Sequence, residues 1–106
     1  MEITENFDME QMNEAADRAS ALMRTLGHKG RLLILCQLVG GEKSVGELSD
    51  SLDIPQSPLS QHLSRMRKEG LVETRRQAQS IYYSIKAVEV GKIIECLYGL
   101  YCADDA

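Results

Sequence analysis

Residues 44–69 constrain the fold most, because they contain two short segments with helical periodicity separated by an explicit break. Ser44-Val-Gly-Glu47 matches the capping box S-x-x-E, which starts a helix by satisfying its first backbone N–H groups. Residues 53–56 interrupt the pattern, and Ser57-Pro58 restarts it with a preferred N-cap followed by proline at the first helical position. The segment predicts two helices joined by a tight turn, with the second closed by Gly70.

Regular hydrophobic patterns flank this pair of helices on both sides. Apolar residues recur every three or four positions over 8–26 and 87–102, which predicts two long amphipathic helices. Residues 28–39 are apolar around much of the circumference and predict a central, buried helix. Residues 71–85 hold two runs of strand formers around a short turn, which predicts a β-hairpin. The predicted fold is mainly α with a hairpin wing, in one winged helix-turn-helix domain over 1–106.

The net charge of −4 argues against a nucleic-acid partner only if the charge is spread evenly, and it is not. Residues 1–27 carry two basic and six acidic side chains, whereas residues 60–80 carry five basic and two acidic ones. This basic window covers the second helix of the pair and the hairpin, the parts that would meet DNA.

One face of the 57–69 helix, opposite Leu59, gathers small hydroxyl, amide and cationic groups. Amide and guanidinium groups read base edges in the major groove, and serine or lysine binds phosphate. The hairpin would add contacts to the backbone or minor groove. An ordinary solvated surface would have a similar composition. The predicted contacts to double-stranded DNA are Ser57, Ser60, Gln61, His62, Ser64, Arg65, Lys68, Arg75, Arg76 and Gln79.

The two long outer helices exceed what one small core can cover, so the sequence predicts a homodimer joined through residues 8–26 and 87–102. Two recognition helices related by a two-fold axis would fit a pseudo-palindromic operator whose half-sites lie about one helical turn apart.

Five sequence blocks stand out: Leu-Gly-His-Lys-Gly-Arg-Leu-Leu-Ile-Leu at 26–35, Ser-Val-Gly-Glu-Leu at 44–48, Ser-x-x-Ser-Gln-His-Leu at 57–63, Arg-Lys-Glu-Gly-Leu-Val at 67–72 and the tyrosine pair at 82–83. They resemble the ArsR/SmtB winged-helix repressors, and the resemblance extends over residues 15–102. The resemblance implies a dimer, with recognition by the 57–69 helix and dimerisation through the first and last helices.

Metal sensing, common in that family, is disfavoured here. Ser44 and Gly46 stand where one family site has cysteines, and residues 87–102 contain no histidine for another. His28 is interpreted as a helix-start residue and His62 as part of the DNA face or beside it. The three cysteines form no close C-x-x-C set, so neither metal nor cofactor is expected, although spacing alone does not test a site between helices.

Cys36, Cys96 and Cys102 are expected to be reduced at rest, because the acidic N-terminus lacks a signal-like apolar region and predicts a cytoplasmic protein. Composition alone favours Cys36 as a small buried apolar side chain. Residues 33–39 and 97–103, however, resemble the cysteine segments of the sulfur-responsive branch, the BigR, SqrR and HlyU type regulators. In that branch a disulfide or polysulfide bridge joins the two thiols. The resemblance implies Cys36 and Cys102 as the redox-sensing pair. Cys96, about 240 degrees from Cys102 around the predicted helix, is interpreted as a packing residue or a bystander.

The function implied is a repressor that releases its operator when persulfide or polysulfide donors bridge this pair. Three alternatives remain open from sequence: a thiol-redox-responsive activator that displaces a silencing protein, a small thiol peroxidase, and a winged-helix module that binds protein. The peroxidase is disfavoured because the cysteines lack an electropositive setting and an evident His or Asp partner. A membrane protein is not expected, because no apolar run approaches about 20 residues.

Overall fold

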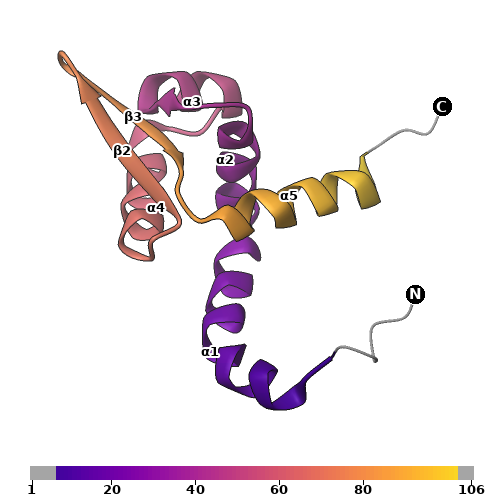
Figure 1. The fold of residues 1–106 in the computed structure, drawn as a ribbon. Helices are drawn as coiled ribbons and strands as arrows, with labels where there is room; N and C mark the ends of the chain where they lie inside the picture. The colour runs from indigo at the N-terminus through magenta and orange to yellow at the C-terminus, as the bar shows by residue number, and fades with distance from the viewer. Residues whose placement is uncertain (1–6, 103–106) are drawn as a thin grey trace.

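The computed structural model describes residues 7–102 and has the predicted winged helix-turn-helix fold (Figure 1). The recognition unit, formed by α2 to α4 and the wing, lies to one side, and α1 and α5 extend away from it (Figure 1). The elements in chain order are α1 (Met9–Leu26), α2 (Lys29–Val39), β1 (Lys43–Ser44), α3 (Val45–Leu52), α4 (Gln56–Lys68), β2 (Val72–Gln77), β3 (Ser80–Ile85) and α5 (Val88–Tyr101).

The capping box at the start of α3 is confirmed. The Ser44 hydroxyl accepts a hydrogen bond from the Glu47 N–H at 3.1 Å, and the Glu47 carboxylate accepts one from the Ser44 N–H at 2.8 Å. The predicted N-cap at Ser57 is wrong, because α4 begins at Gln56 with Pro55 as its N-cap. Proline already holds the φ angle needed to enter a helix, and Pro58 is tolerated within the first turn, where backbone N–H groups have no intrahelical partner.

The core lies where the apolar, inward-facing sides of α2, α3, α4 and α5 meet. Three apolar side chains of α4, those of Leu59, Leu63 and Met66, have no exposed surface, as the helical spacing predicts. They pack in one cluster with residues of the other three helices and of β2. This cluster fixes which side of α4 faces away from the protein. The other fully buried apolar members are Ile34, Leu35, Leu48, Val72 and Val90.

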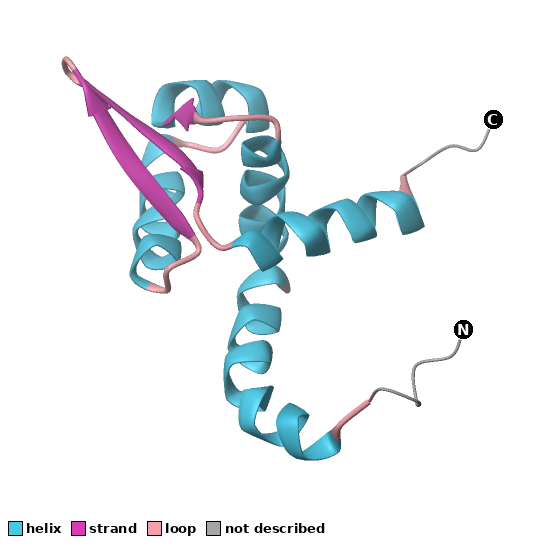
Figure 2. Cartoon of the chain, viewed as in Figure 1, coloured by secondary structure: helices cyan, strands magenta, loops and turns pink. Residues whose placement is uncertain are grey.

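A third strand, β1, extends the hairpin into a three-stranded antiparallel sheet in the order β1-β3-β2 (Figure 2). Lys43 pairs with Tyr83 and Ser44 with Tyr82. β1 is not predicted by the sequence pattern, since a strand of two residues has too few positions to show alternation. Its consequence is that the base of the wing is hydrogen-bonded to the residues that start α3.

Large apolar side chains remain exposed on α1 and α5. Met9, Met12 and Met23 on α1 are 41% to 62% exposed, and Leu100 on α5 is 71% exposed. Within the described chain, burial in α1 is confined to Thr25 and Leu26 at its C-terminal end. The single chain therefore leaves an apolar surface on both outer helices. Among the helices described, none is long and apolar enough to cross a bilayer.

Replacing Ser44 with alanine is expected to lower the free energy of unfolding by about 0.5 to 2 kcal/mol, because the first turn of α3 loses its side-chain acceptor. The control is Ser51→Ala, an exposed position inside the same helix, where the change should be close to neutral. Urea unfolding followed by circular dichroism measures both. Equal losses in the two variants would contradict a capping role.

Candidate DNA-contact surface and cysteine pocket

The exposed face of α4 brings together most of the predicted DNA-contact residues. They lie on the side of the helix opposite Leu59, Leu63 and Met66, whose burial turns the polar face outward. A flat polar face on a helix that the core holds from behind can enter a major groove without disturbing the fold. The exposed residues of this face are Ser57, Ser60, Gln61, Ser64, Arg65 and Lys68.

His62 lies at the edge of this face and is half-buried against α2. Its ring centroid is 4.7 Å from that of His28, and the two rings are tilted by 56°. Burial lowers the pKa of His62, and electrostatic interactions with His28, Arg31 and Arg65 lower it further, so its neutral form is favoured. His28 caps α2 as predicted, with Nδ1 accepting a hydrogen bond from the Gly30 N–H at 3.1 Å.

Arg65 is held in place by a chain of contacts that reaches α1. Its Nε lies 3.3 Å from Glu69 Oε2, and Glu69 Oε1 accepts a hydrogen bond from the Thr25 hydroxyl at 2.7 Å. Thr25 is 1% exposed and lies at the end of α1. A candidate base-reading side chain is therefore linked through Glu69 to a buried hydroxyl at the end of α1.

Replacing Thr25 with valine keeps the side-chain shape and removes this hydrogen bond. The expected loss is about 1 to 2 kcal/mol in the free energy of unfolding, because the bond is made to a charged carboxylate. Glu69→Gln retains an acceptor oxygen for Thr25 and should cost less. Chemical denaturation of both variants tests this order, and a neutral Thr25→Val variant would show that the hydrogen bond contributes nothing.

On the wing, Arg75, Arg76 and Gln79 are all exposed, but Arg75 is also paired with neighbouring side chains. The Arg75 guanidinium donates to both carboxylate oxygens of Glu42, with Nε at 3.1 Å, and to the Gln77 side-chain oxygen at 2.7 Å. It also lies over the Tyr82 ring, 5.1 Å from its centroid. Hydrogen bonding to Arg75 lowers the pKa of the Glu42 carboxyl, which keeps the pair ionised. Arg75 therefore differs from the other two predicted wing contacts, because its guanidinium is hydrogen-bonded to Glu42 and Gln77.

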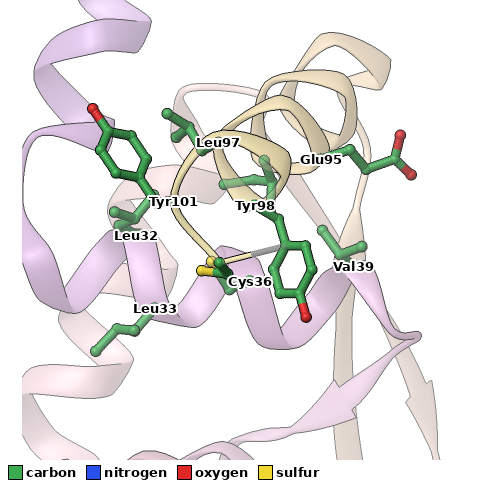
Figure 3. Close-up of a pocket in the computed structure, with 10 residues that line it drawn as sticks. Leu32, Leu33, Cys36, Val39, Glu95, Leu97, Tyr98 and Tyr101 are labelled. Carbon is green, nitrogen blue, oxygen red and sulfur yellow. The ribbon is translucent and has the colours of Figure 1, made fainter. Parts of the chain in front are cut away.

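A pocket of about 710 Å³ lies between α2 and α5, and both Cys36 and Cys102 line it (Figure 3). Cys36 projects from the central helix, and Cys102 is the C-cap of α5. Cys96 is exposed and is not among the described lining residues. The pocket brings together two cysteines that are 66 positions apart in the sequence. Its other lining residues are Leu32, Leu33, Val39, Ile94, Glu95, Leu97, Tyr98 and Tyr101.

Cys36 is exposed, so the expectation from composition that it is a buried apolar side chain is wrong. The buried side of α2 is formed by Ile34, Leu35 and Leu38, which turns Cys36 toward the pocket. All three cysteines are free thiols. Partial burial raises the pKa of Cys36, and the nearby Cys102 raises it further. Within residues 7–102, no three His, Cys, Asp or Glu side chains are placed to hold a metal ion together.

The alkylation rate of Cys36 is expected to keep rising with pH beyond the point where a free cysteine levels off, because a raised pKa delays formation of the thiolate. Replacing Cys102 with serine removes one cause of the shift and should move the midpoint to lower pH. Iodoacetamide labelling with peptide mass analysis measures this, with Cys96→Ser as the matched control. An unchanged midpoint in Cys102→Ser would contradict interaction between the two thiols.

Comparison with known proteins places this architecture among bacterial regulators. The family described as "Bacterial regulatory protein, arsR family" matches residues 28–74. The transcriptional activator HlyU of Vibrio cholerae is 43% identical over 96 residues, which cover 91% of this chain and 89% of that protein. The biofilm growth-associated repressor of Agrobacterium fabrum is 43% identical over 94 residues, covering 89% and 80% of the two chains.

Solved structures similar to this chain are also those of bacterial transcriptional regulators. The crystal structure of the transcriptional repressor BigR from Xylella fastidiosa superposes with a TM-score of 0.86 at 39% identity, covering 92% of this chain and all of that one. Reduced HlyU from V. cholerae gives a TM-score of 0.83 at 44% identity over 89% of this chain and 99% of the other. The relatives are regulators and not enzymes. With the winged fold and these relatives, the chain belongs to the ArsR family of bacterial transcriptional regulators.

Proposed function

We propose that the protein is a cytoplasmic, homodimeric repressor that senses reactive sulfur species and releases its operator when a bridge joins Cys36 and Cys102. The observation that carries the proposal is the shared pocket: two free, exposed thiols from the central and last helices line one cavity. Cysteines that approach each other only in the folded chain can form a bridge that alters how two helices sit.

The exposed face of α4 is proposed to read a pseudo-palindromic operator. Gln61 and Arg65 present the amide and guanidinium groups that recognise base edges, and Lys68 is placed to contact phosphate. Arg76 and Gln79 on the wing would add contacts outside the major groove. His62 would support the face from its half-buried position beside His28.

The dimer is proposed to form through the exposed apolar residues of α1 and α5, including Met12, Met23 and Leu100. Such surfaces are rare on monomeric proteins at this density, and a two-fold axis would bury the same patch on both subunits. Since α5 also contributes to the cysteine pocket, a change inside the pocket can reach the interface along one helix.

The sensing step is a two-electron oxidation of the two thiols by a persulfide, R–S–SH. The Cys36 thiolate attacks the outer sulfur, the S–S bond breaks and R–S⁻ leaves as the thiol, which gives Cys36–S–SH. The Cys102 thiolate then attacks Cys36 Sγ and expels hydrogen sulfide. The product is a Cys36–Cys102 disulfide, and longer donors would leave additional sulfur atoms in the bridge.

The bridge would bind the end of α5 to the middle of α2 and so shift the two recognition helices relative to each other. A differential affinity of about 2 to 3 kcal/mol between the two arrangements reduces operator binding about a hundredfold. Such coupling is within the usual range for an effector site.

An activator that displaces a silencing protein is the second candidate, since the HlyU relative is named a transcriptional activator. Expression of a reporter fused to the target promoter, measured with and without the silencing protein, distinguishes the repressor from the activator. Repression by the reduced protein alone supports the first candidate, and expression that requires it supports the second.

The proposal is tested by measuring operator affinity before and after treatment with a polysulfide, with peroxide and a disulfide donor in parallel. Mass analysis then looks for the peptide pair joined through Cys36 and Cys102. Loss of affinity together with this crosslink is the expected result. An unchanged affinity after complete crosslinking would exclude the pair as the switch.

A further inference from the structure

The residues that line the cysteine pocket indicate which class of sulfur donor it binds. Cys36 and Cys102 are the proposed reacting groups, and the remaining lining is formed by aliphatic side chains, two tyrosine rings and one carboxylate, that of Glu95. Among the described lining residues, Glu95 carries the single formal charge, and it is negative. We infer that the pocket selects uncharged, apolar organic polysulfanes, R–S–S–S–R, over anionic sulfur donors; this rests on the proposed function of the cysteine pair.

The volume of the pocket exceeds what a bare sulfur chain needs. At about 710 Å³ it falls in the range of sites that hold small organic molecules, with room for alkyl groups on both sides of a reacting sulfur. In the view of Figure 3, Tyr98 and Tyr101 lie on opposite sides of Cys36, and both tyrosine hydroxyls point away from the Cys36 sulfur. The surfaces offered to a bound alkyl group are therefore aromatic and aliphatic carbon.

Electrostatics act against anionic donors. An inorganic polysulfide dianion or a glutathione-type donor would lose hydration on entering an apolar groove, and the described lining residues offer no cation in return. Glu95 at the pocket would add repulsion. Hydrogen peroxide is small and uncharged, but it has no apolar surface with which to accumulate there.

The reaction with a trisulfide balances without a further oxidant. The Cys36 thiolate attacks the central sulfur, one outer S–S bond breaks, and R–S⁻ leaves as a thiol. The Cys102 thiolate attacks the same sulfur and releases the second R–S⁻. Two cysteine thiols are oxidised, the trisulfide is reduced to two thiols, and Cys36 and Cys102 are joined through one inserted sulfur atom.

The first experiment compares dimethyl, diethyl and dipropyl trisulfides for the rate of crosslinking in the intact protein. Each methylene that enters the pocket should raise the second-order rate constant about fourfold, until the pocket is filled. Free cysteine, treated in the same way, gives the intrinsic reactivity of the three trisulfides. Its rate constant should stay the same or fall as the alkyl groups become larger. A protein rate that follows the order seen with free cysteine overturns the inference.

The second experiment uses glutathione trisulfide, an anionic donor, with Glu95→Gln. Removing the carboxylate should raise the rate with this donor about threefold to fivefold more than it raises the rate with dimethyl trisulfide, because only the anionic donor is repelled by Glu95. Glu89→Gln is the matched control, since it makes the same charge change on the same helix at an exposed position outside the described lining. Equal effects in both variants would contradict the inference.

The outcomes separate the two levels of the proposal. Crosslinking that proceeds equally fast with apolar and anionic donors overturns the selectivity and leaves the Cys36–Cys102 switch standing. Absence of the crosslink with every donor overturns both.

Discussion

Serine in place of Cys36 or Cys102 is expected to abolish the response of operator binding to sulfur donors. The unaltered protein should lose about a hundredfold in affinity when treated, whereas each single variant should keep the affinity of its reduced form, because one thiol cannot close the bridge. Operator binding measured by fluorescence anisotropy, before and after treatment, reports both states. The substitutions should leave the fold intact, since both cysteines are exposed.

Cys96→Ser is the control that this prediction needs. Cys96 is also an exposed thiol on α5, but it lies outside the described lining of the pocket. It should therefore respond like the unaltered protein. A normal response in Cys36→Ser or Cys102→Ser would refute the sensing pair, and a lost response in Cys96→Ser would show that the pair was assigned wrongly.

The second large effect is expected on α4. Replacing Gln61 and Arg65 together with alanine should weaken specific operator binding by a hundredfold or more, since each base contact contributes about 1 to 3 kcal/mol. Affinity for unrelated DNA should fall much less. Titrations with operator and scrambled duplexes measure the two quantities, and thermal unfolding checks that the variant is folded.

Two lysine variants serve as references for the α4 prediction. Lys68→Ala, on the same face, should weaken binding to both duplexes alike and reduce its dependence on ionic strength, as expected of a phosphate contact. Lys92→Ala, exposed on α5, should have little effect. If the double variant loses operator and scrambled DNA in equal measure, α4 is not the element that reads sequence.

Local chemistry made most of the fold predictable. The Ser44 capping box, the spacing of Leu59, Leu63 and Met66, and the change to strand formers after Gly70 all lie within a few residues of the structure they produce. The error at Ser57 is also local. Pro55 and Ser57 are two positions apart, and Pro55, not Ser57, is the N-cap of α4.

The candidate site was less accessible to sequence reasoning, because its key contacts join distant residues. Glu42 with Arg75, and Thr25 with Glu69, are 33 and 44 positions apart. The charge count placed Arg75 in the basic window and predicted it as a DNA contact, but the fold pairs it with the Glu42 carboxylate. The exposure of Cys36 and the apolar pocket around it likewise depend on how α5 crosses α2, which periodicity alone does not specify.

The engagement of Arg75 by Glu42 has a consequence for the thermodynamics of DNA binding. A cation that already has a carboxylate partner holds phosphate only by exchanging one anion for another. The Glu42 side chain would then take up a cation from solution as the phosphate displaces it, which offsets the counterion that the DNA releases. The basic wing would thus contribute fewer released ions than its arginines suggest, and the protein would depend more on base contacts than on charge to remain on its operator.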